Sequence, residues 1–222
     1  MPAESEKRLR ATVDAIMNEQ SSMHAVWALL VGLYGKSKKR RDFIYARAGS
    51  FFGIMGDPLV DYVVLTVAKL LGLSPSRGKQ ELCLGKIETI LRDMNETHLY
   101  RDLRKKYKRL KKDCSAIKAQ RDNRIAHFGY EAHLESKPDM LPPLIRTQIE
   151  EVLRGIDGFM KKAWEVSMDS PYSFDPSRWD GATKDILTHL AQSARYKELQ
   201  KDGTIRDPDD GLAKYKKILC LR

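Results

Sequence analysis

Cysteine is scarce in this 222-residue sequence, which contains only Cys83, Cys114 and Cys220. Their wide spacing and odd number argue against a disulfide framework and against a cysteine-based zinc site, both of which use cysteines in pairs. Unpaired thiols are usual in reducing compartments. We therefore expect a cytoplasmic protein.

The sequence also lacks the hydrophobic runs that mark leaders and membrane spans. Its first twenty residues are charged and amphipathic, which is not the pattern of a secretory signal. No uninterrupted apolar run approaches the roughly eighteen residues that a membrane span needs. The longest candidate, VVLTVAKLLGL, is interrupted by Lys69 and broken by Gly72. We expect no membrane association.

Strand signals and internal repeats are missing, and helical periodicity is found instead. Apolar residues three or four positions apart predict helices over 4–33, 39–51, 58–72, 81–94, 97–128, 144–166 and 182–199. Asp57-Pro58 is a start signal, in which Asp caps the helix and Pro takes its first position. The helix that follows is apolar on most sides, so we expect it in the core.

The predicted fold class is therefore all-α, an up-and-down helical bundle with a C-terminal helical appendage. We place the bundle in residues 1–169 and the appendage in residues 170–222. The boundary is the segment DSPYSFDPSRWDG, which is rich in Pro, Ser and Asp and has the composition of a loop.

Basic charge is the strongest bias of the composition, with a formal net charge of +10. Between Thr97 and His127 there are eleven Lys or Arg and three acidic residues. A solvated helix face is the usual explanation of such a run, but those faces normally mix signs and gain i to i+4 pairs. We therefore expect a phosphate backbone to bind here. The contacting residues are predicted to be Arg104, Lys105, Lys108, Arg109 and Lys112.

The long helix that carries this charge also has one apolar stripe. The stripe consists of Leu103, Tyr107, Leu110, Cys114 and Ile117. The same spacing continues to Arg121, which lies eighteen residues after Leu103 and so shares its azimuth on an ideal helix. A buried guanidinium without a partner is costly, so this turn should face a cleft or a subunit interface that admits an anion. Alternatively, Arg121 pairs with an internal carboxylate, or the helix rotates or kinks.

His127 follows Arg121 at a spacing that an ideal helix does not bring onto the same face. It lies about 120° from Arg121 around the axis. Either the helix distorts, or Arg121 and His127 meet across two copies of the helix. A His near a helix C-terminus is otherwise usually a cap.

The stretch RDNRIAH resembles the signature of the HEPN superfamily, an Arg, a polar residue and a His after four to six intervening positions. Together with FFGIMGDPLVDYVVLTVAKLLG before it and HLESKPDMLPP after it, the chain resembles the abortive-infection type U branch over roughly Val26 to Val166. The resemblance implies a HEPN-like bundle that forms a homodimer, with two facing motifs in one metal-free ribonuclease centre and no cofactor.

In the chemistry that this resemblance implies, an RNA 2′-hydroxyl attacks the adjacent phosphate. His127 would be the general acid or base, and Arg121 would stabilise charge on the phosphoryl oxygens. Asp122, Asn123 and Arg124 would be supporting residues. RNA is the expected partner, and an antitoxin or a nucleotidyltransferase partner is implied at the family level. The alternatives are a non-catalytic RNA-binding or scaffolding module and a helical interaction protein without RNA.

Three other features of the sequence are weaker evidence of a functional site. GKQELCLGK differs from a phosphate-binding loop, because its glycines are wrongly spaced and Ile87 stands where Ser or Thr would bind magnesium. A metal site formed by His127, Glu131, His133 and Glu135 has no recognised ligand spacing. His24 and His98 have no constellation around them in the sequence, and Trp27 and Trp164 are expected in the core, with Trp179 anchoring the appendage.

Overall fold

The computed structural model of the chain describes residues 2–73, 82–122 and 144–204, and all regular structure within them is helical. The elements are α1 (Pro2–Tyr34), α2 (Lys38–Leu70), α3 (Leu84–Asp93), α4 (Thr97–Asp113), α5 (Ser115–Gln120), α7 (Arg146–Ser167), the 3-10 helix η3 (Pro176–Trp179) and α8 (Asp180–Lys201). The all-α prediction is confirmed.

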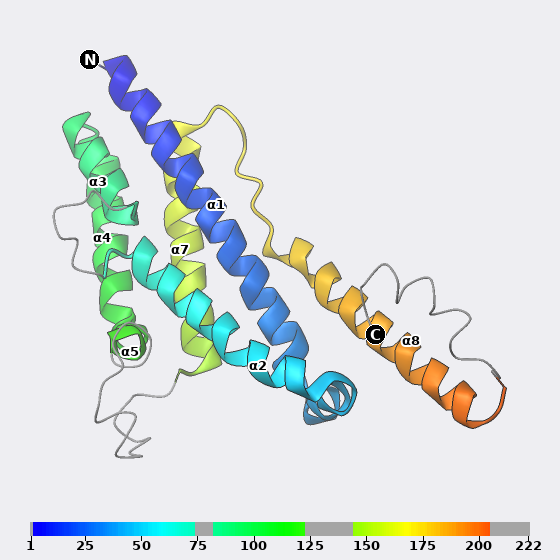
Figure 1. Cartoon of the computed structure of the whole chain (residues 1–222). Helices are drawn as coiled ribbons and strands as arrows, with labels where there is room; N and C mark the ends of the chain where they lie inside the picture. The colour runs from blue at the N-terminus through cyan, green and yellow to red at the C-terminus, as the bar shows by residue number, and fades with distance from the viewer. Residues whose placement is uncertain (1, 74–81, 123–143, 205–222) are drawn as a thin grey trace.

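The bundle is organised around α1, which contacts α2, α3 and α7, while α4 packs between α3 and α7 (Figure 1). Its core consists of aliphatic side chains that recur every three or four residues along each helix, which is why each helix buries one face. Ile16, Ile87, Leu103 and Phe159 are examples, and each of these four side chains is fully buried. Trp27 and Trp164 pack at the edge of this core as partly buried side chains.

Helix α2 differs from the prediction of two helices with a start at Asp57-Pro58. It begins at Lys38, after the N-cap Ser37, and continues through Pro58 to Leu70. Its break lies at Ala48, whose φ of −147° and ψ of 52° are not helical. Pro58 is tolerated because the carbonyl it leaves without a helical donor belongs to Ile54, which is 70% exposed to solvent.

The same helix is the one candidate membrane span in the described part of the chain, by length and composition only. Its most apolar stretch of eighteen residues contains at most two charged side chains. Core helices of soluble proteins can be equally long and apolar. Helix α2 packs on α1, α5 and α8. Its length and composition alone do not place it in a membrane.

Helix α8 forms a smaller apolar cluster with the end of α1 and the first half of α2, away from the main core. Leu33, Ile44 and Phe52 are buried there, and Leu187 and Leu190 of α8 pack against them. Helix α8 thereby lies along the end of α1 and beside the first half of α2, pointing away from the bundle (Figure 1). The division into residues 1–169 and 170–222 stays a prediction.

Candidate functional site

The predicted stripe of the basic helix is confirmed. Leu103, Leu110, Cys114 and Ile117 are buried. Tyr107 is half-buried, and its hydroxyl donates a hydrogen bond of 2.8 Å to the carbonyl of Leu71. On the opposite side α7 approaches closely at Gly155, where an added Cβ would lie 2.3 Å from Leu110 Cδ2. The stripe therefore fixes α4 between the end of α2 and the middle of α7.

The single long helix predicted over residues 97–128 is wrong in one respect. Helix α4 ends at Asp113, because Cys114 has a φ of −94° and a ψ of 18°. A separate short helix, α5, follows, and the chain then widens into a π-type turn at 121–122. The break lets α5 leave the axis of α4 and pack against α2. Wide turns of this kind are frequent at functional sites.

Arg121 occupies this wide turn and is buried, with 6% of its surface exposed. Its guanidinium forms an ion pair with the carboxylate of Asp122, the next residue in the chain. Asp122 is half-buried and also lies 3.3 Å from Lys118 Nζ. The cationic position in the stripe is therefore accompanied by a carboxylate from the same turn, as the ion-pair alternative requires.

The other residues of the predicted motif, Asn123, Arg124 and His127, lie outside the described residues. The meeting of Arg121 with His127 stays a prediction, and so do their catalytic roles. The structure does place Arg121 and Asp122 together, directly after α5.

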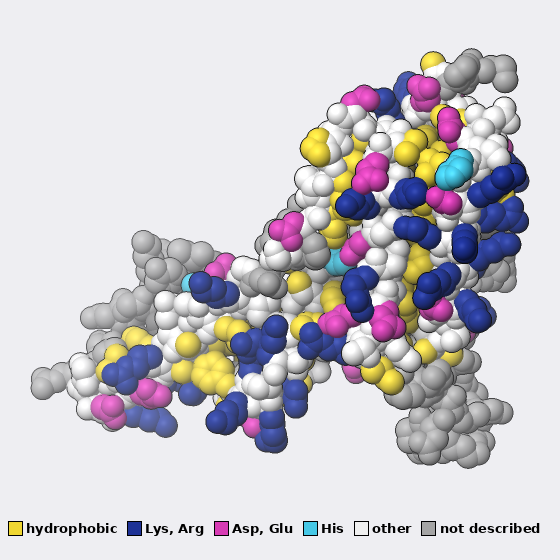
Figure 2. Space-filling view, turned by 180° about the vertical axis from the view of Figure 1, so that it is seen from behind, with side chains coloured by type: hydrophobic (Ala, Val, Ile, Leu, Met, Phe, Trp, Pro, Cys, Tyr) yellow, Lys and Arg dark blue, Asp and Glu magenta, His cyan; other side chains and the backbone are white. Residues whose placement is uncertain are grey.

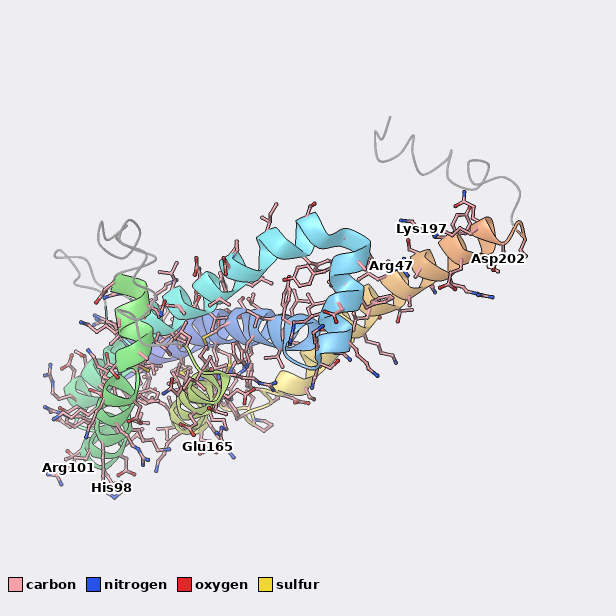
Figure 3. All side chains as sticks on the ribbon, turned by 90° about the horizontal axis from the view of Figure 1, so that it is seen from below. Arg47, His98, Arg101, Glu165, Lys197 and Asp202 are labelled. Atoms are coloured by element: carbon pink, nitrogen blue, oxygen red, sulfur yellow. The ribbon has the colours of Figure 1, made fainter. Side chains whose placement is uncertain are left out.

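The basic residues predicted to bind RNA are all exposed on α4. In Figure 2, Lys and Arg gather at the right, where α3 and α4 lie in that view. Arg109 has a loose ion pair with Asp113, at 3.7 Å, and Arg104 stacks over the Tyr100 ring, 5.5 Å from its centroid. Among the described residues, Lys105, Lys108 and Lys112 have no ion pair. A surface of uncompensated cations is thus available to a polyanion.

One carboxyl group, that of Glu88 on α3, lies among these cations. Partial burial raises the pKa of Glu88, and the positive charges of Arg104, Lys108 and Lys111 act in the opposite direction. Its Oε1 is buried without a hydrogen-bond partner in the described part of the chain. The basic surface therefore includes an acid whose ionised form the fold disfavours.

His24 has a constellation that the sequence did not reveal, which corrects the prediction that it stands alone. Its Nε2 lies 2.8 Å from Asp157 Oδ1, and Gln20 donates a hydrogen bond of 2.5 Å to the same oxygen. Tyr172 joins the cluster, and burial, reinforced by the charge of Asp157, raises the pKa of Tyr172 to about 12. His24 also contacts the ring of Phe174, edge to face. The cluster ties the segment after α7 to α1.

The remaining chemistry of the described residues is limited. No group of three or more His, Cys, Asp or Glu lies together there in a way that could hold a metal ion. Burial and the charge of Asp113 raise the pKa of the Cys114 thiol to about 12, so this thiol is neutral and a poor nucleophile. Expectations about cofactors stay predictions, because the candidate ligands His127, Glu131, His133 and Glu135 lie outside the described residues.

Comparison with known proteins finds one family. The family model HEPN_AbiU2, described as AbiU2, matches residues 6–190. The match covers most of the chain and extends beyond Val26 to Val166, into the first half of α8. No curated protein and no solved structure matches the chain.

Proposed function

The chain belongs to the HEPN_AbiU2 family, and from that premise we propose that it is a metal-independent endoribonuclease of the abortive-infection type. The observation that supports this most directly is the buried Arg121, held with Asp122 in a wide turn at the end of α5, the short helix that follows the basic helix α4. A cation fixed by the fold is preorganised, so it can stabilise a developing phosphoryl charge without reorganising during the reaction.

The proposed reaction uses the 2′-hydroxyl of the RNA as the nucleophile. His127 takes the proton from this hydroxyl or gives one to the leaving 5′-oxygen, since an imidazole can do both near neutral pH. Arg121 stabilises the charge on the phosphoryl oxygens, and Asp122 orients its guanidinium. The lysines and arginines on α4 hold the RNA by its backbone. The 2′-oxygen forms a bond to phosphorus while the 5′-oxygen leaves, so the products carry a cyclic phosphate and a 5′-hydroxyl.

The proposed centre is shared by two copies of the chain, which meet at an apolar surface on α2. This surface, the α2 stripe, consists of Phe51, Ile54, Pro58, Tyr62 and Leu65. Its spacings of three and four place these residues on one side of the helix, and all five are exposed in the single chain. Exposed apolar surface of this kind commonly marks a protein interface. Because α5 packs on α2, a second copy on the α2 stripe lies beside the element that leads to Arg121.

The catalytic proposal is tested by incubating the purified protein with single-stranded RNA in EDTA and analysing the ends of the products. We expect cleavage without metal and a 2′,3′-cyclic phosphate. His127→Ala should lower the rate by about a hundred-fold or more, the usual scale for losing a general acid or base, and leave RNA affinity nearly unchanged. Arg121→Lys keeps the buried charge but loses the planar fork, so it should also slow cleavage.

His189→Ala is the matched control, because His189 is an exposed histidine on α8. Its rate should equal that of the unmodified protein. If the unmodified protein binds RNA but does not cut it, a non-catalytic RNA-binding module is the better description. The ion pair of Arg121 with Asp122 would then be structural.

A further inference from the structure

A cavity of about 430 Å³ lies between the end of α1, the start of α2 and the first turns of α8. It is separate from the basic surface of α4, and its lining includes Lys36, Arg40, Thr183, Lys184, Leu187 and Thr188. The volume falls in the range of small-molecule sites. The proposed ribonuclease does not use this cavity.

The cavity exists because α8 crosses α1 at a glycine. A Cβ added to Gly32 would lie 2.4 Å from Thr183 Oγ1, so any other residue here would push the two helices apart. On the other side of the crossing, Leu187 packs with Leu33, Ile44 and Phe52 and forms an apolar wall.

The lining has three cationic side chains and no acidic one. Arg40 is held in place by a hydrogen bond of 2.7 Å from its Nη1 to the carbonyl of Gly32. Lys36 and Lys184 have no ion pair within the described residues, whereas neighbouring Lys38 is paired with Asp42. Two uncompensated lysines beside a fixed guanidinium make the cavity attractive to an anion with more than one negative charge.

Two helix N-termini add to this field. Helix α2 begins at Lys38, and α8 begins at Asp180, so that Thr183 lies in its first turn. The N-terminal ends of helices carry partial positive charge and favour anions. Both helices are long, and both start beside the cavity.

A buried hydroxyl points independently to a ligand. Thr183 is 6% exposed, and its Oγ1 has no hydrogen-bond partner among the residues that the structure describes. Buried hydroxyl groups are normally hydrogen-bonded. Thr183 lines the cavity, so an anionic oxygen bound there could accept the hydrogen bond that the Thr183 hydroxyl can donate.

From these features we infer that the cavity between α1, α2 and α8 binds a phosphate monoester. Lys36, Arg40 and Lys184 neutralise the dianion, Thr183 donates a hydrogen bond, and Leu187 contacts the group that carries the phosphate. A nucleoside monophosphate and the 5′-phosphorylated end of an RNA share this chemistry. All of the lining residues except Ala191 lie within the segment that matches the family.

The first arm of the test is calorimetric titration of the full chain with AMP and with adenosine. We expect AMP to bind and adenosine not to bind. Lys36→Gln with Lys184→Gln should weaken AMP binding by about tenfold or more, the scale expected for losing charge-assisted contacts. Thr183→Val keeps the shape next to Gly32 and removes only the hydroxyl, so it should weaken AMP by several-fold without lowering the melting temperature of the protein.

The second arm uses a 2′-O-methyl RNA dodecamer, which cannot be cut through a 2′-hydroxyl, with or without a 5′-phosphate. Preference for the 5′-phosphate that the double variant loses identifies an RNA end, and AMP binding without such a preference identifies a free nucleotide. Lys197→Gln with Lys201→Gln, further along α8, is the charge-matched control. The inference is overturned if neither AMP nor a 5′-phosphate contributes to binding, or if the control weakens binding as much as the double variant.

Discussion

At position 121 a guanidinium occupies a place in the stripe that apolar groups fill at positions 110, 114 and 117. Its burial could be predicted from the spacing alone, because three- and four-residue steps keep side chains on one face. Its ion pair with Asp122 could not. Adjacent residues do not face each other on a regular helix, so the spacing of the stripe gives no indication of this pair.

Cys114 tests the stripe at the residue where α4 ends. Replacing it by Asp should lower the free energy of unfolding by about 3 kcal/mol or more, because a carboxylate would be buried beside Asp113 without a partner. Cys114→Ala, which removes only the sulfur, should cost much less. Urea denaturation measures both. A urea unfolding curve for Cys114→Asp like that of the unmodified protein would mean that this position is not in the core.

Glu88 carries a pH-dependent prediction. Since its pKa is raised in the folded state, the folded chain holds this proton more tightly than the unfolded chain. Its contribution to stability is therefore favourable at low pH and is lost as the pH rises from the ordinary glutamate pKa through the raised one. Glu88→Gln should increase stability at pH 7 and change it little below the ordinary glutamate pKa. Thermal unfolding at both pH values tests this, and equal effects at both would contradict it.

At the scale of the helices, the sequence predicted their existence better than their interruptions. The start of α4 at Thr97 and the extents of α1 and α7 follow from apolar periodicity. The breaks at Ala48 and Cys114 do not, because neither residue is a helix breaker. They arise where α2 and α5 turn to pack on neighbouring elements. Conversely, the strong local signal at Asp57-Pro58 is overridden, since the proline lies on a solvent-facing side of α2.

The basic surface of α4 is a property of the whole element. Replacing Lys105, Lys108, Arg109 and Lys112 with Gln should weaken RNA binding and reduce the slope of log affinity against log salt by about 0.7 for each lost phosphate contact. Anisotropy titrations at several salt concentrations measure this slope. The charge-matched control replaces the exposed residues Lys7, Arg8, Lys197 and Lys201 with Gln. If both variants change the slope equally, RNA does not select the α4 surface.

At the scale of the whole molecule, contacts between distant segments are what the sequence conceals. His24 and Asp157 are 133 positions apart, and no local pattern pairs them. The cavity beside Gly32 is similar, because it depends on α8 returning to the end of α1. The α2 stripe is an intermediate case. Its apolar residues can be recognised in the sequence, but the sequence predicts only the helix after Asp57-Pro58 to lie in the core. The packing of α2 reveals which apolar residues remain outside.

The α2 stripe leads to a prediction about the assembled protein. Ile54 is 70% exposed in the single chain. Ile54→Asp should therefore change the free energy of unfolding of the single chain by no more than about 0.5 kcal/mol. In a dimer that meets at the α2 stripe, the same change buries a carboxylate and should shift the protein to monomers in sedimentation experiments. Val166→Asp is the matched control, because Val166 is an exposed apolar residue on α7. Ribonuclease activity should fall with the dimer and recover at high protein concentration if the centre is shared. A dimer that survives Ile54→Asp but dissociates with Val166→Asp would place the interface on α7 instead.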